Sequence, residues 1–260
     1  MSSPSPLGKD SPARSTSAVD PGLRIPKATV DDVNRLADQA ADILAKAREA
    51  ALEPAARKTL RKFSLTEVAA LLGVSVKTIQ RGLKSGELPQ GERAPGNRLL
   101  FALEEVHALQ DKLGLSPARD PRTDAPVVIA IANFKGGVGK TSTTVHLAQY
   151  FALRGYRTLA VDLDAQASLT TLFGILPDSE VPTEETALPY FEGSADTLPV
   201  RRTHWSRLDL IPANLSLYGA EFSLANRQNT EEGFRFYRAL ETGLKPLYPN
   251  YDVIVIDTPP

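Results

Sequence analysis

The sequence predicts an α/β domain with a mostly parallel sheet flanked by helices, preceded by a mainly α module and by an amphipathic helix near the N-terminus. Apolar runs at 127–132, 158–162 and 253–257 support the sheet, because short apolar runs separated by helical patterns are typical of strands buried on both faces. The first run enters a glycine-rich turn, and the other two end in aspartate. A basic stretch at 63–88 supports the smaller module, because its spacing fits two short helices joined by a glycine turn.

Composition limits the classes of protein to which the chain can belong. Its 260 residues suffice for two domains with cores of their own, and its apolar and charged fractions are those of a globular protein. Cysteine is absent, which excludes disulfides, thiolate metal sites and cysteine nucleophiles and favours a reducing cytoplasm. No apolar run approaches the roughly 18 residues of a membrane span, and the start lacks the apolar core of a secretory signal. We therefore expect a cytoplasmic protein that does not enter a membrane.

Two segments precede the basic module. Residues 1–28 predict a disordered arm, because residues 1–26 hold six serines and five prolines with few large apolar groups, and burial cannot offset the entropy of ordering. Residues 29–53 predict an amphipathic helix, because apolar residues recur at helical spacing from Val33 to Ala50. This helix could dimerise with a second copy or pack on its own neighbour, and the alanines in its stripe favour dimerisation only modestly.

Residues 54–119 predict a winged helix-turn-helix domain. Ser64 and Ser75 can each cap a helix, and Gly73 permits the tight turn between the two helices. Residues 89–101 then predict a wing and residues 103–113 a closing helix, an arrangement that resembles the MerR type. A helix-turn-helix with a wing is a common DNA-binding unit.

Basic and polar side chains on the second helix and the wing make DNA the expected ligand of this domain. The domain holds 11 lysines and arginines against 6 aspartates and glutamates, whereas the whole chain has a formal net charge of −1. The alternative is a small helical bundle with a solvated basic face. A proline-containing linker at 120–126 follows the domain. The candidate DNA contacts, chosen as donors for phosphates and purine edges, are Lys77, Thr78, Gln80, Arg81 and Lys84 on the helix and Arg93 and Arg98 in the wing.

The turn after the first apolar run has the residues of a phosphate-binding loop. Glycines let backbone N–H groups approach an anion closely, a lysine reaches the terminal phosphates, and a threonine hydroxyl can hold Mg²⁺. The helix after the turn points its positive N-terminal end at the anion. The candidate nucleotide-binding residues are Lys135, Gly136, Gly137, Val138, Gly139, Lys140, Thr141 and Ser142, with Lys140 as the phosphate lysine and Thr141 as a metal-binding residue.

Aspartates at the ends of the two later strands complete the expected site. Asp164 follows the strand at 158–162, and Asp257 ends the strand at 253–257. One aspartate in such a place could simply cap the next helix, but the loop and both aspartates in series after one sheet pattern form a stronger signal. The last strand indicates a Walker B element, in which Asp257 would hold the Mg²⁺ shell together with Thr141.

From 126 to 260 the chain resembles the ParA/MinD class of P-loop ATPases, in particular the RepA proteins of plasmid replication–partition operons. The resemblance rests on the loop Lys-Gly-Gly-Val-Gly-Lys-Thr at 135–141, whose first lysine is extra to an ordinary phosphate-binding loop. It extends to local matches at 146–157, 166–174 and 208–215. The resemblance therefore covers about half of the chain, from the first strand of the sheet onward.

The resemblance also implies the chemistry of the site. It implies ATP and Mg²⁺ as ligands, Asp164 beside the attacking water, and Lys135 reaching across a nucleotide-sandwich homodimer to the partner's phosphates. The candidate catalytic residues are thus Lys135, Lys140 and Asp164. The sequence departs from the family at Phe134, where a phosphate-binding loop has its first glycine, and at Ala165, where the family commonly has proline. Because the family continues beyond its Walker B strand, we expect 127–260 to be a truncated P-loop domain.

The function that the resemblance implies is that of a DNA-partition ATPase of a plasmid or chromosome. In the family, the ATP-bound dimer binds DNA without sequence preference, and a ParB-type centromere-binding protein stimulates hydrolysis. We expect the winged domain to bind operator DNA and repress the protein's own operon. The alternative from another class is a nucleotide-switched transcriptional repressor without significant ATP turnover. A MinD-like membrane positioner and a metal-cluster carrier are further alternatives, and the DNA module argues against both.

Two remaining features have no expected chemical role. The stretch at 177–199 is rich in proline, glutamate and threonine and predicts a long loop or an insertion on the P-loop domain. His107, His146 and His204 are too scattered along the chain to suggest a metal site.

Overall fold

The computed structural model describes residues 29–51, 58–117, 119–120 and 122–260. The predicted disordered arm at 1–28 and the predicted boundary at 53–54 lie outside these residues. The chain divides into two compact units, Met1–Pro54 and Ala55–Pro260, and each is described by itself.

The described part of the first unit is the helix α1 (Val30–Ala51). Its N-terminus is capped, because the Asp32 carboxylate accepts hydrogen bonds from the Thr29 N–H at 2.9 Å and from the Thr29 hydroxyl at 2.7 Å. Val33, Leu36 and Ile43 of the predicted apolar stripe are more than half exposed. The helix is therefore confirmed, and its pairing with a second copy stays a prediction.

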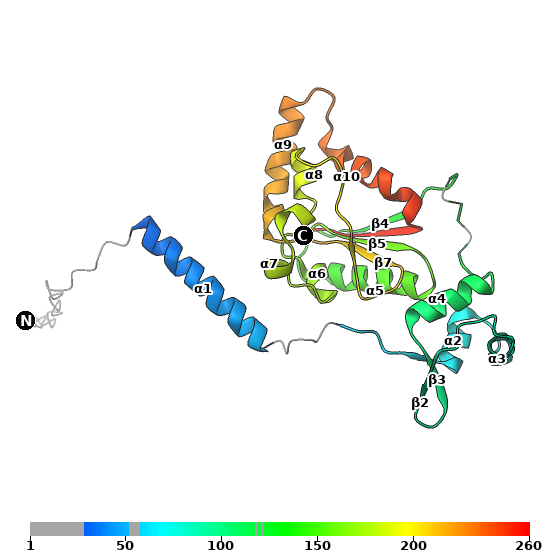
Figure 1. Cartoon of the computed structure of the whole chain (residues 1–260). Helices are drawn as coiled ribbons and strands as arrows, with labels where there is room; N and C mark the ends of the chain where they lie inside the picture. Colours follow the sequence, from blue (N-terminus) through cyan, green and yellow to red (C-terminus); the bar gives the residue numbers. More distant parts are fainter. Residues whose placement is uncertain (1–28, 52–57, 118, 121) are drawn as a thin grey trace, which may run out of the picture. The chain divides into compact units, whose positions relative to one another are not determined.

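The second unit begins with a small module of three helices and a three-stranded sheet (Figure 1). The strands are antiparallel in the order β1-β3-β2, and Phe63 of β1 pairs with Phe101 of β3. The hairpin of β2 and β3 is the predicted wing. The elements are β1 (Phe63–Ser64), α2 (Leu65–Leu72), α3 (Val76–Ser85), β2 (Glu92–Ala94), β3 (Arg98–Phe101) and α4 (Leu103–Lys112).

Capping residues fix the two helices of the helix-turn-helix. Ser64 and Glu67 form the reciprocal capping box of α2, and the Ser75 hydroxyl accepts the Thr78 N–H at 3.1 Å at the start of α3. Gly73 ends α2 with φ of 68°, a left-handed conformation that favours glycine. These contacts confirm the predicted helix-turn-helix. The module has its own core, whose fully buried members include Val68, Ile79, Phe101, Val106 and Leu109.

The larger part of the second unit is a five-stranded sheet in the order β4-β8-β5-β7-β6. The first four strands in this order are parallel, and β6 is antiparallel to β7. The mostly parallel sheet that the sequence predicts is therefore confirmed. The strands are β4 (Val127–Ile131), β5 (Thr158–Asp162), β6 (Arg201–Arg202), β7 (Leu208–Ile211) and β8 (Val253–Asp257).

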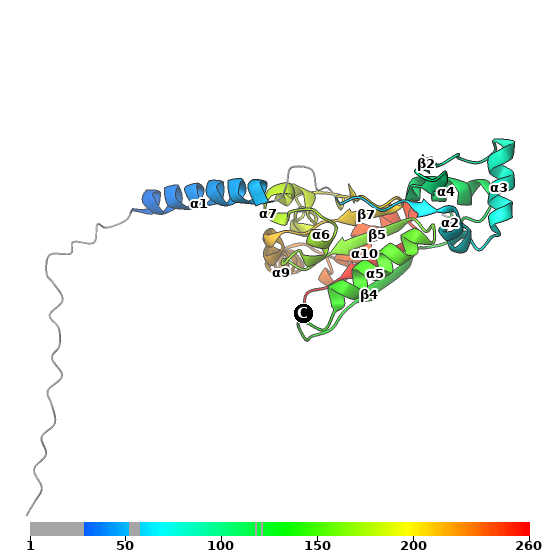
Figure 2. The same ribbon diagram turned by 90° about the horizontal axis from the view of Figure 1, so that it is seen from below.

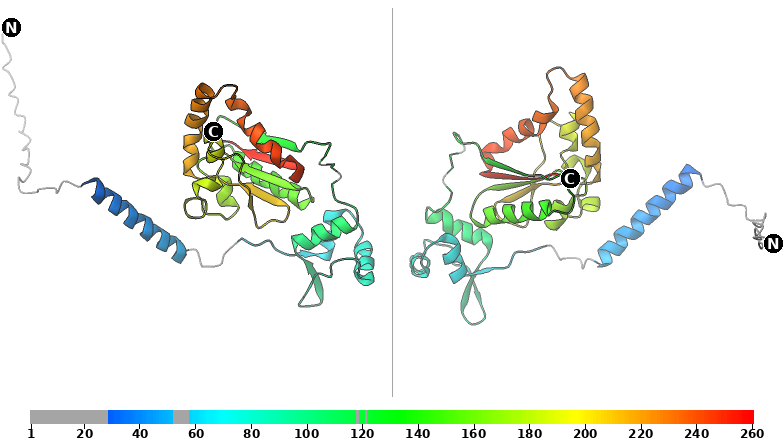
Figure 3. Two further views of the ribbon diagram at one scale, coloured as in Figure 1. Left: turned by 45° about the horizontal axis from the view of Figure 1, so that its top comes forward. Right: turned by 180° about the vertical axis from the view of Figure 1, so that it is seen from behind.

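Helices cover both faces of this sheet (Figures 2 and 3). One layer holds α5 (Lys140–Leu153) and α6 (Ser168–Leu172); the other holds α8 (Leu188–Glu192), α9 (Ala220–Thr230) and α10 (Phe236–Leu244). Alternate residues of one strand serve the two layers, since Ala160 joins the core under α5 while Leu159 and Val161 join the core under α8 and α10. Burial on both faces explains the continuous apolar runs of the sequence.

The stretch at 177–199 is not the long loop that we predicted. It contains α7 (Pro177–Glu180), the 3₁₀ helix η1 (Thr183–Glu185) and α8, and Leu188, Phe191 and Leu198 are buried in the core. Pro177 and Pro189 lie in the first turns of α7 and α8, where the missing N–H costs no hydrogen bond, so they do not prevent helix formation. Two further 3₁₀ helices, η2 (Leu215–Gly219) and η3 (Lys245–Asn250), precede α9 and β8.

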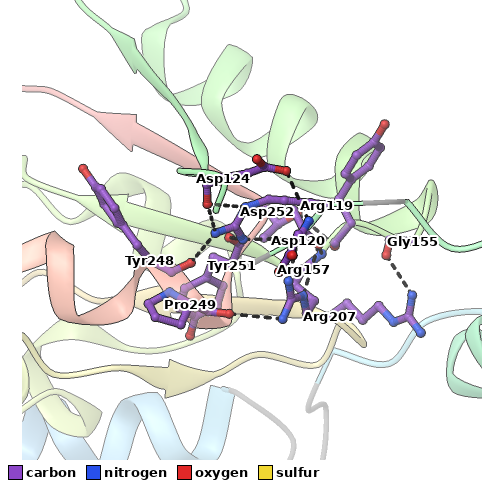
Figure 4. Close-up of polar contacts among 12 residues, drawn as sticks. Arg119, Asp120, Asp124, Gly155, Arg157, Arg207, Tyr248, Pro249, Tyr251 and Asp252 are labelled. Carbon is purple, nitrogen blue, oxygen red and sulfur yellow. Dashed lines mark hydrogen bonds and ion pairs between the residues drawn. The ribbon is translucent and has the colours of Figure 1, made fainter. Parts of the chain in front are cut away.

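An arginine network fixes the segment that enters β4 (Figure 4). The Arg119 guanidinium donates to the carbonyl of Tyr248 at 2.9 Å, to that of Tyr251, and to that of Asp124 at 2.7 Å. Asp252, with its side chain 7% exposed, pairs with Arg119 at 3.4 Å and with Arg157 at 2.7 Å. Burial would raise the pKa of Asp252, but the hydrogen bonds from Arg157 and the charges of the two arginines hold it below its usual value.

The helix α4 packs on the carboxyl end of α5 and on the turn before β7. His107 is buried, and its Nε2 lies 2.8 Å from the Ala152 carbonyl oxygen while its Nδ1 lies 2.9 Å from the Ser206 hydroxyl. A carbonyl only accepts, so Nε2 carries the proton of the neutral ring. Arg207, in the left-handed region with φ of 61°, donates to the carbonyl of Gly155 (Figure 4). Arg207 also pairs with Asp111 of α4. The winged module is thus joined to the P-loop half of the unit by the buried His107 and by the partly exposed Arg207–Asp111 pair.

Candidate nucleotide-binding site and nucleic-acid interface

The loop between β4 and α5 has an open, glycine-dependent backbone. Gly137 and Gly139 have φ of 72° and 88°, left-handed conformations that L side chains rarely adopt. A Cβ atom added at Gly136, Gly137 or Gly139 would meet nothing within 4 Å, so the space above the loop is free. The loop leads directly into the N-terminus of α5 at Lys140. Free N–H groups and a helix N-terminus together suit an anion such as a phosphate chain.

The two lysines of the loop lie in different surroundings. Lys140 is half-buried, and its ammonium group donates to the Lys135 carbonyl at 3.5 Å. Lys135 is exposed, and its N–H donates to the Asn133 side chain at 2.9 Å in the turn after β4. Phe134, which replaces the usual first glycine, has a fully exposed side chain. The loop therefore projects Phe134 and Lys135 away from the core.

Asp257 lies at the end of β8 in a buried, polar environment. Its Oδ1 accepts a hydrogen bond from the Thr144 hydroxyl at 3.2 Å. Burial raises the pKa of Asp257 and the nearby Asp164 adds to the rise, whereas hydrogen bonds from Thr141 and Thr144 and the charge of Lys140 oppose it. Parallel pairing places Asp257 level with Ile131 of β4 and Asp162 of β5. The loop after β4, the turn after β5 and Asp257 therefore lie at one end of the sheet, together with Lys140, Thr141 and Asp164.

This set of residues fits a magnesium ion. Asp257 Oδ2 is buried and has no hydrogen-bond partner among the described residues. A cation bound to this oxygen would compensate for its lost contact with water. Mg²⁺ takes carboxylate and hydroxyl oxygens together with water and substrate phosphates. Asp257 and Thr141 would hold the ion there. Within the described residues, no group of three or more His, Cys, Asp or Glu side chains forms another metal centre.

Asp164 lies in a tight turn between β5 and α6. Its side chain is half-buried and accepts the Gln166 N–H at 2.9 Å, and its carbonyl accepts the Ala167 N–H at 2.8 Å. Ala167 has φ of 52°, a left-handed conformation that closes the turn. Asp162, two positions earlier, is fully buried, and burial raises its pKa to about 7 against the hydrogen bonds that it accepts from Thr170. Asp164 was predicted as a site residue from the sequence, whereas Asp162 was not.

The predicted nucleic-acid contacts form an exposed surface on α3 and the wing. Ile79 and Leu83 of α3 are buried, so the opposite face of the helix is solvent-exposed. The Thr78 hydroxyl lies 2.9 Å from that of Ser75, and it therefore belongs to the helix cap as well as to this surface. The exposed members are Lys77, Thr78, Gln80, Arg81, Lys84, Arg93 and Arg98.

His107 and Arg207 are polar residues whose position sequence reasoning did not identify. They connect the winged module to the P-loop half through contacts with residues 45 to 99 positions away in the chain. No local pattern marks such contacts, and only the apolar spacing around His107 on α4 indicated that it could face inward.

Within the described residues, no helix is both long and apolar enough to cross a bilayer.

A glycine loop and two aspartates at the carboxyl edge of a parallel sheet define a P-loop nucleotide-binding protein, here joined to a winged helix-turn-helix. Residues 127–260 match the family described as AAA domain, and residues 63–114 match the family described as Helix-turn-helix domain. The first match covers just over half of the chain, and the chain belongs to this family, among the ParA-like P-loop proteins.

Curated relatives extend the similarity across both modules. "Putative replication protein A" of Sinorhizobium fredii is 38% identical over 221 residues, which cover 80% of this chain and 54% of the relative. Protein SopA of Escherichia coli is 35% identical over 219 residues, which cover 80% of this chain and 55% of SopA. Sporulation initiation inhibitor protein Soj of Bacillus subtilis is 40% identical over 134 residues, covering 51% and 49%. The chain thus spans about half the length of these relatives.

A solved structure described as "Partition Protein" has the same arrangement of elements. The two chains align with a TM-score of 0.59 at 22% identity, and the alignment covers 88% of this chain and 64% of the solved chain. At this identity the likeness concerns the fold, and it includes the winged module because so much of the chain is aligned.

Proposed function

We propose that the chain is a ParA-type DNA-partition ATPase that hydrolyses ATP and that also binds operator DNA to repress its own operon. The observation that carries the proposal is the convergence of Lys140, Thr141, Asp164 and Asp257 beside an open glycine loop. The match of this chain to the relatives SopA and Soj supports the biological role.

Each residue of the site has a distinct part in the proposed reaction. The loop N–H groups and Lys140 bind the phosphates, and Thr141 and Asp257 hold Mg²⁺, which supplies positive charge to the oxygens of the transferred phosphoryl group. Asp164 orients the water that attacks this group. Lys135, which projects away from the core, reaches the nucleotide of a second copy in an ATP-dependent homodimer.

DNA and a second protein are the proposed partners. The ATP-bound dimer binds DNA of any sequence and so associates with the nucleoid, while the exposed donors of α3 and the wing bind the operator. A ParB-type centromere-binding protein stimulates hydrolysis and thereby couples turnover to the cargo DNA. The resemblance of residues 126–260 to the ParA class supports this partner.

Replacing Asp164 tests the enzymatic part of the proposal. Asp164→Ala should leave the ATP dissociation constant nearly unchanged but lower the hydrolysis rate by about 100-fold or more, because orientation of water acts on the transition state. Steady-state phosphate release and nucleotide binding are measured with Mg²⁺ and DNA present. Asp196→Ala, which removes an exposed carboxylate elsewhere on the same domain, is the control and should behave as the unaltered chain. Equal hydrolysis by both variants would disprove the role of Asp164.

The second candidate function is a nucleotide-switched repressor without significant turnover. The exposed donors of α3 favour it, because operator binding by this surface requires no hydrolysis. Tight Mg²⁺-ATP binding that alters operator affinity, with no phosphate release in the unaltered chain, would support this candidate against the ATPase.

A further inference from the structure

A buried hydrogen-bond network lies directly behind the Asp164 turn. Asp162 and Thr170 are both completely buried. Asp162 Oδ2 accepts hydrogen bonds from the Thr170 N–H at 2.9 Å and from the Thr170 hydroxyl at 2.7 Å. The same hydroxyl accepts the Ala213 N–H at 2.9 Å. The network thus ties together the end of β5, the helix α6 and the segment that follows β7.

The other oxygen of this carboxylate holds the backbone of Asp164. Asp162 Oδ1 accepts the Asp164 N–H at 3.2 Å. One residue earlier, the Leu163 N–H donates to the Asp257 carbonyl at 3.1 Å, and beyond it the Asp164 carbonyl accepts the Ala167 N–H at 2.8 Å. Successive backbone groups of the turn are therefore fixed, and one of the fixing groups is a buried side chain.

We propose that Asp162 and Thr170 form a positioning pair that sets the place of Asp164 in the ATPase site. Their burial keeps them from touching nucleotide or water, so they act through the Asp164 backbone. The Thr170 hydroxyl donates to one partner and accepts from another, which no apolar side chain of the same size can do. The inference rests on the proposed role of Asp164 as the group that orients water.

The test compares Thr170→Val with Thr170→Ser in the full chain. Valine keeps the shape of threonine and removes the hydroxyl, whereas serine keeps the hydroxyl and removes a methyl group. We expect kcat for ATP hydrolysis to fall about 10- to 100-fold in Thr170→Val, with KM changed by less than about twofold, because a displaced reacting group costs rate without weakening ground-state binding. Thr170→Ser should restore kcat to near the unaltered value.

Thr171→Val is the matched control on the same helix. Its hydroxyl donates only to the Ala167 carbonyl at 3.0 Å within the described residues, and the side chain is exposed. This variant should retain kcat and KM. Unchanged kcat in Thr170→Val, or an equal loss in Thr170→Ser, would overturn the proposal. An equal rise in KM and fall in kcat would indicate general damage to the site and would overturn it as well.

Hydrogen exchange supplies a measurement that does not depend on turnover. The Asp164 amide, followed by NMR, should be protected in the unaltered chain and in Thr170→Ser, and it should exchange at least about tenfold faster in Thr170→Val. Rapid exchange in the unaltered chain would overturn the pairing even if Thr170→Val does not fold. If the unaltered chain releases no phosphate, the proposed ATPase function fails, and the exchange rates alone decide whether the pair holds the turn.

Discussion

At the scale of single residues, the buried oxygen of Asp257 and the exposed ammonium group of Lys135 are complementary features of one site. The buried oxygen lacks a partner within the described residues and suits a cation bound by the same chain. Lys135 lies on an open loop beside a fully exposed Phe134, where it can meet a ligand of another molecule. In the proposed mechanism, these two residues separate the binding of nucleotide from the contact between two copies of the chain.

The first prediction at this scale concerns the two loop lysines. Lys135→Ala should change the ATP dissociation constant of the monomer by less than about twofold, because the Lys135 side chain projects away from the nucleotide site of its own chain. The same change should abolish ATP-dependent dimerisation. Lys140→Ala should weaken nucleotide binding by about 1.5–3 kcal/mol, the scale of a charged hydrogen bond. Sedimentation and nucleotide titration with a slowly hydrolysed ATP analogue measure both effects. Equal loss of affinity in the two variants would contradict the division of roles.

At the scale of elements, the helix α3 is the part of the winged module that presents most of the candidate DNA contacts to solvent. Its buried residues Ile79 and Leu83 fix one face on the module's core, and the exposed face carries Arg81 among other donors. The wing adds further arginines beside it. A protein surface with this composition can bind both phosphates and base edges.

A prediction for this element is that Arg81→Ala separates the two modes of DNA binding. Operator binding should weaken by about 1–3 kcal/mol and lose discrimination, because a bidentate base contact is removed. Non-specific binding by the ATP dimer should persist, because it depends on phosphate charge elsewhere. Titrations of operator DNA with ADP and of arbitrary duplex with ATP, both at fixed salt, measure the two modes. Lys112→Ala, which removes an exposed positive charge on α4 outside the candidate DNA contacts, is the control and should leave operator discrimination unchanged.

The elements that could be predicted from the sequence are those specified by local contacts. The capping box at Ser64 and the glycine at position 73 determine where α2 begins and ends, so the helix-turn-helix was evident. The strands β5 and β8 are buried on both faces, which makes their apolar runs continuous. The prediction of a loop at 177–199 was wrong because Leu188 and Phe191 stand among many prolines and glutamates, so the sequence shows no clear apolar pattern. Their helix is stable only because it packs on the sheet.

At the scale of the whole second unit, the winged module and the sheet are joined where α4 meets the end of α5. The same α5 begins at the phosphate-binding loop, so a single helix runs from the nucleotide site to the module that carries α3. His107 could not be recognised from the sequence, because its partners come from α5 and from the turn before β7. The buried neutral ring makes this junction sensitive to acid.

For the junction, we predict that the free energy of unfolding falls on acidification because the folded chain keeps His107 neutral. Burial, aided by the charge of Arg207, lowers the pKa of His107 from 6.5 to about 4. Between these values the unfolded chain binds a proton that the folded chain does not, so stability is full above pH 6.5 and falls as the pH drops toward 4. The shift corresponds to a loss on the order of 3 kcal/mol. Urea unfolding at several pH values should show this slope in the unaltered chain and not in His107→Gln; the same slope in both would refute the assignment.

Trp205, the only tryptophan of the chain, lies between the core of the winged module and the core under α5. Its indole is partly buried, and the ring of His204 stands beside it at 6.3 Å. An indole that leaves an apolar contact for water emits at longer wavelength. The protein therefore carries an intrinsic fluorescent probe at a junction through which ATP could influence DNA, and fluorescence can follow that junction without any added label.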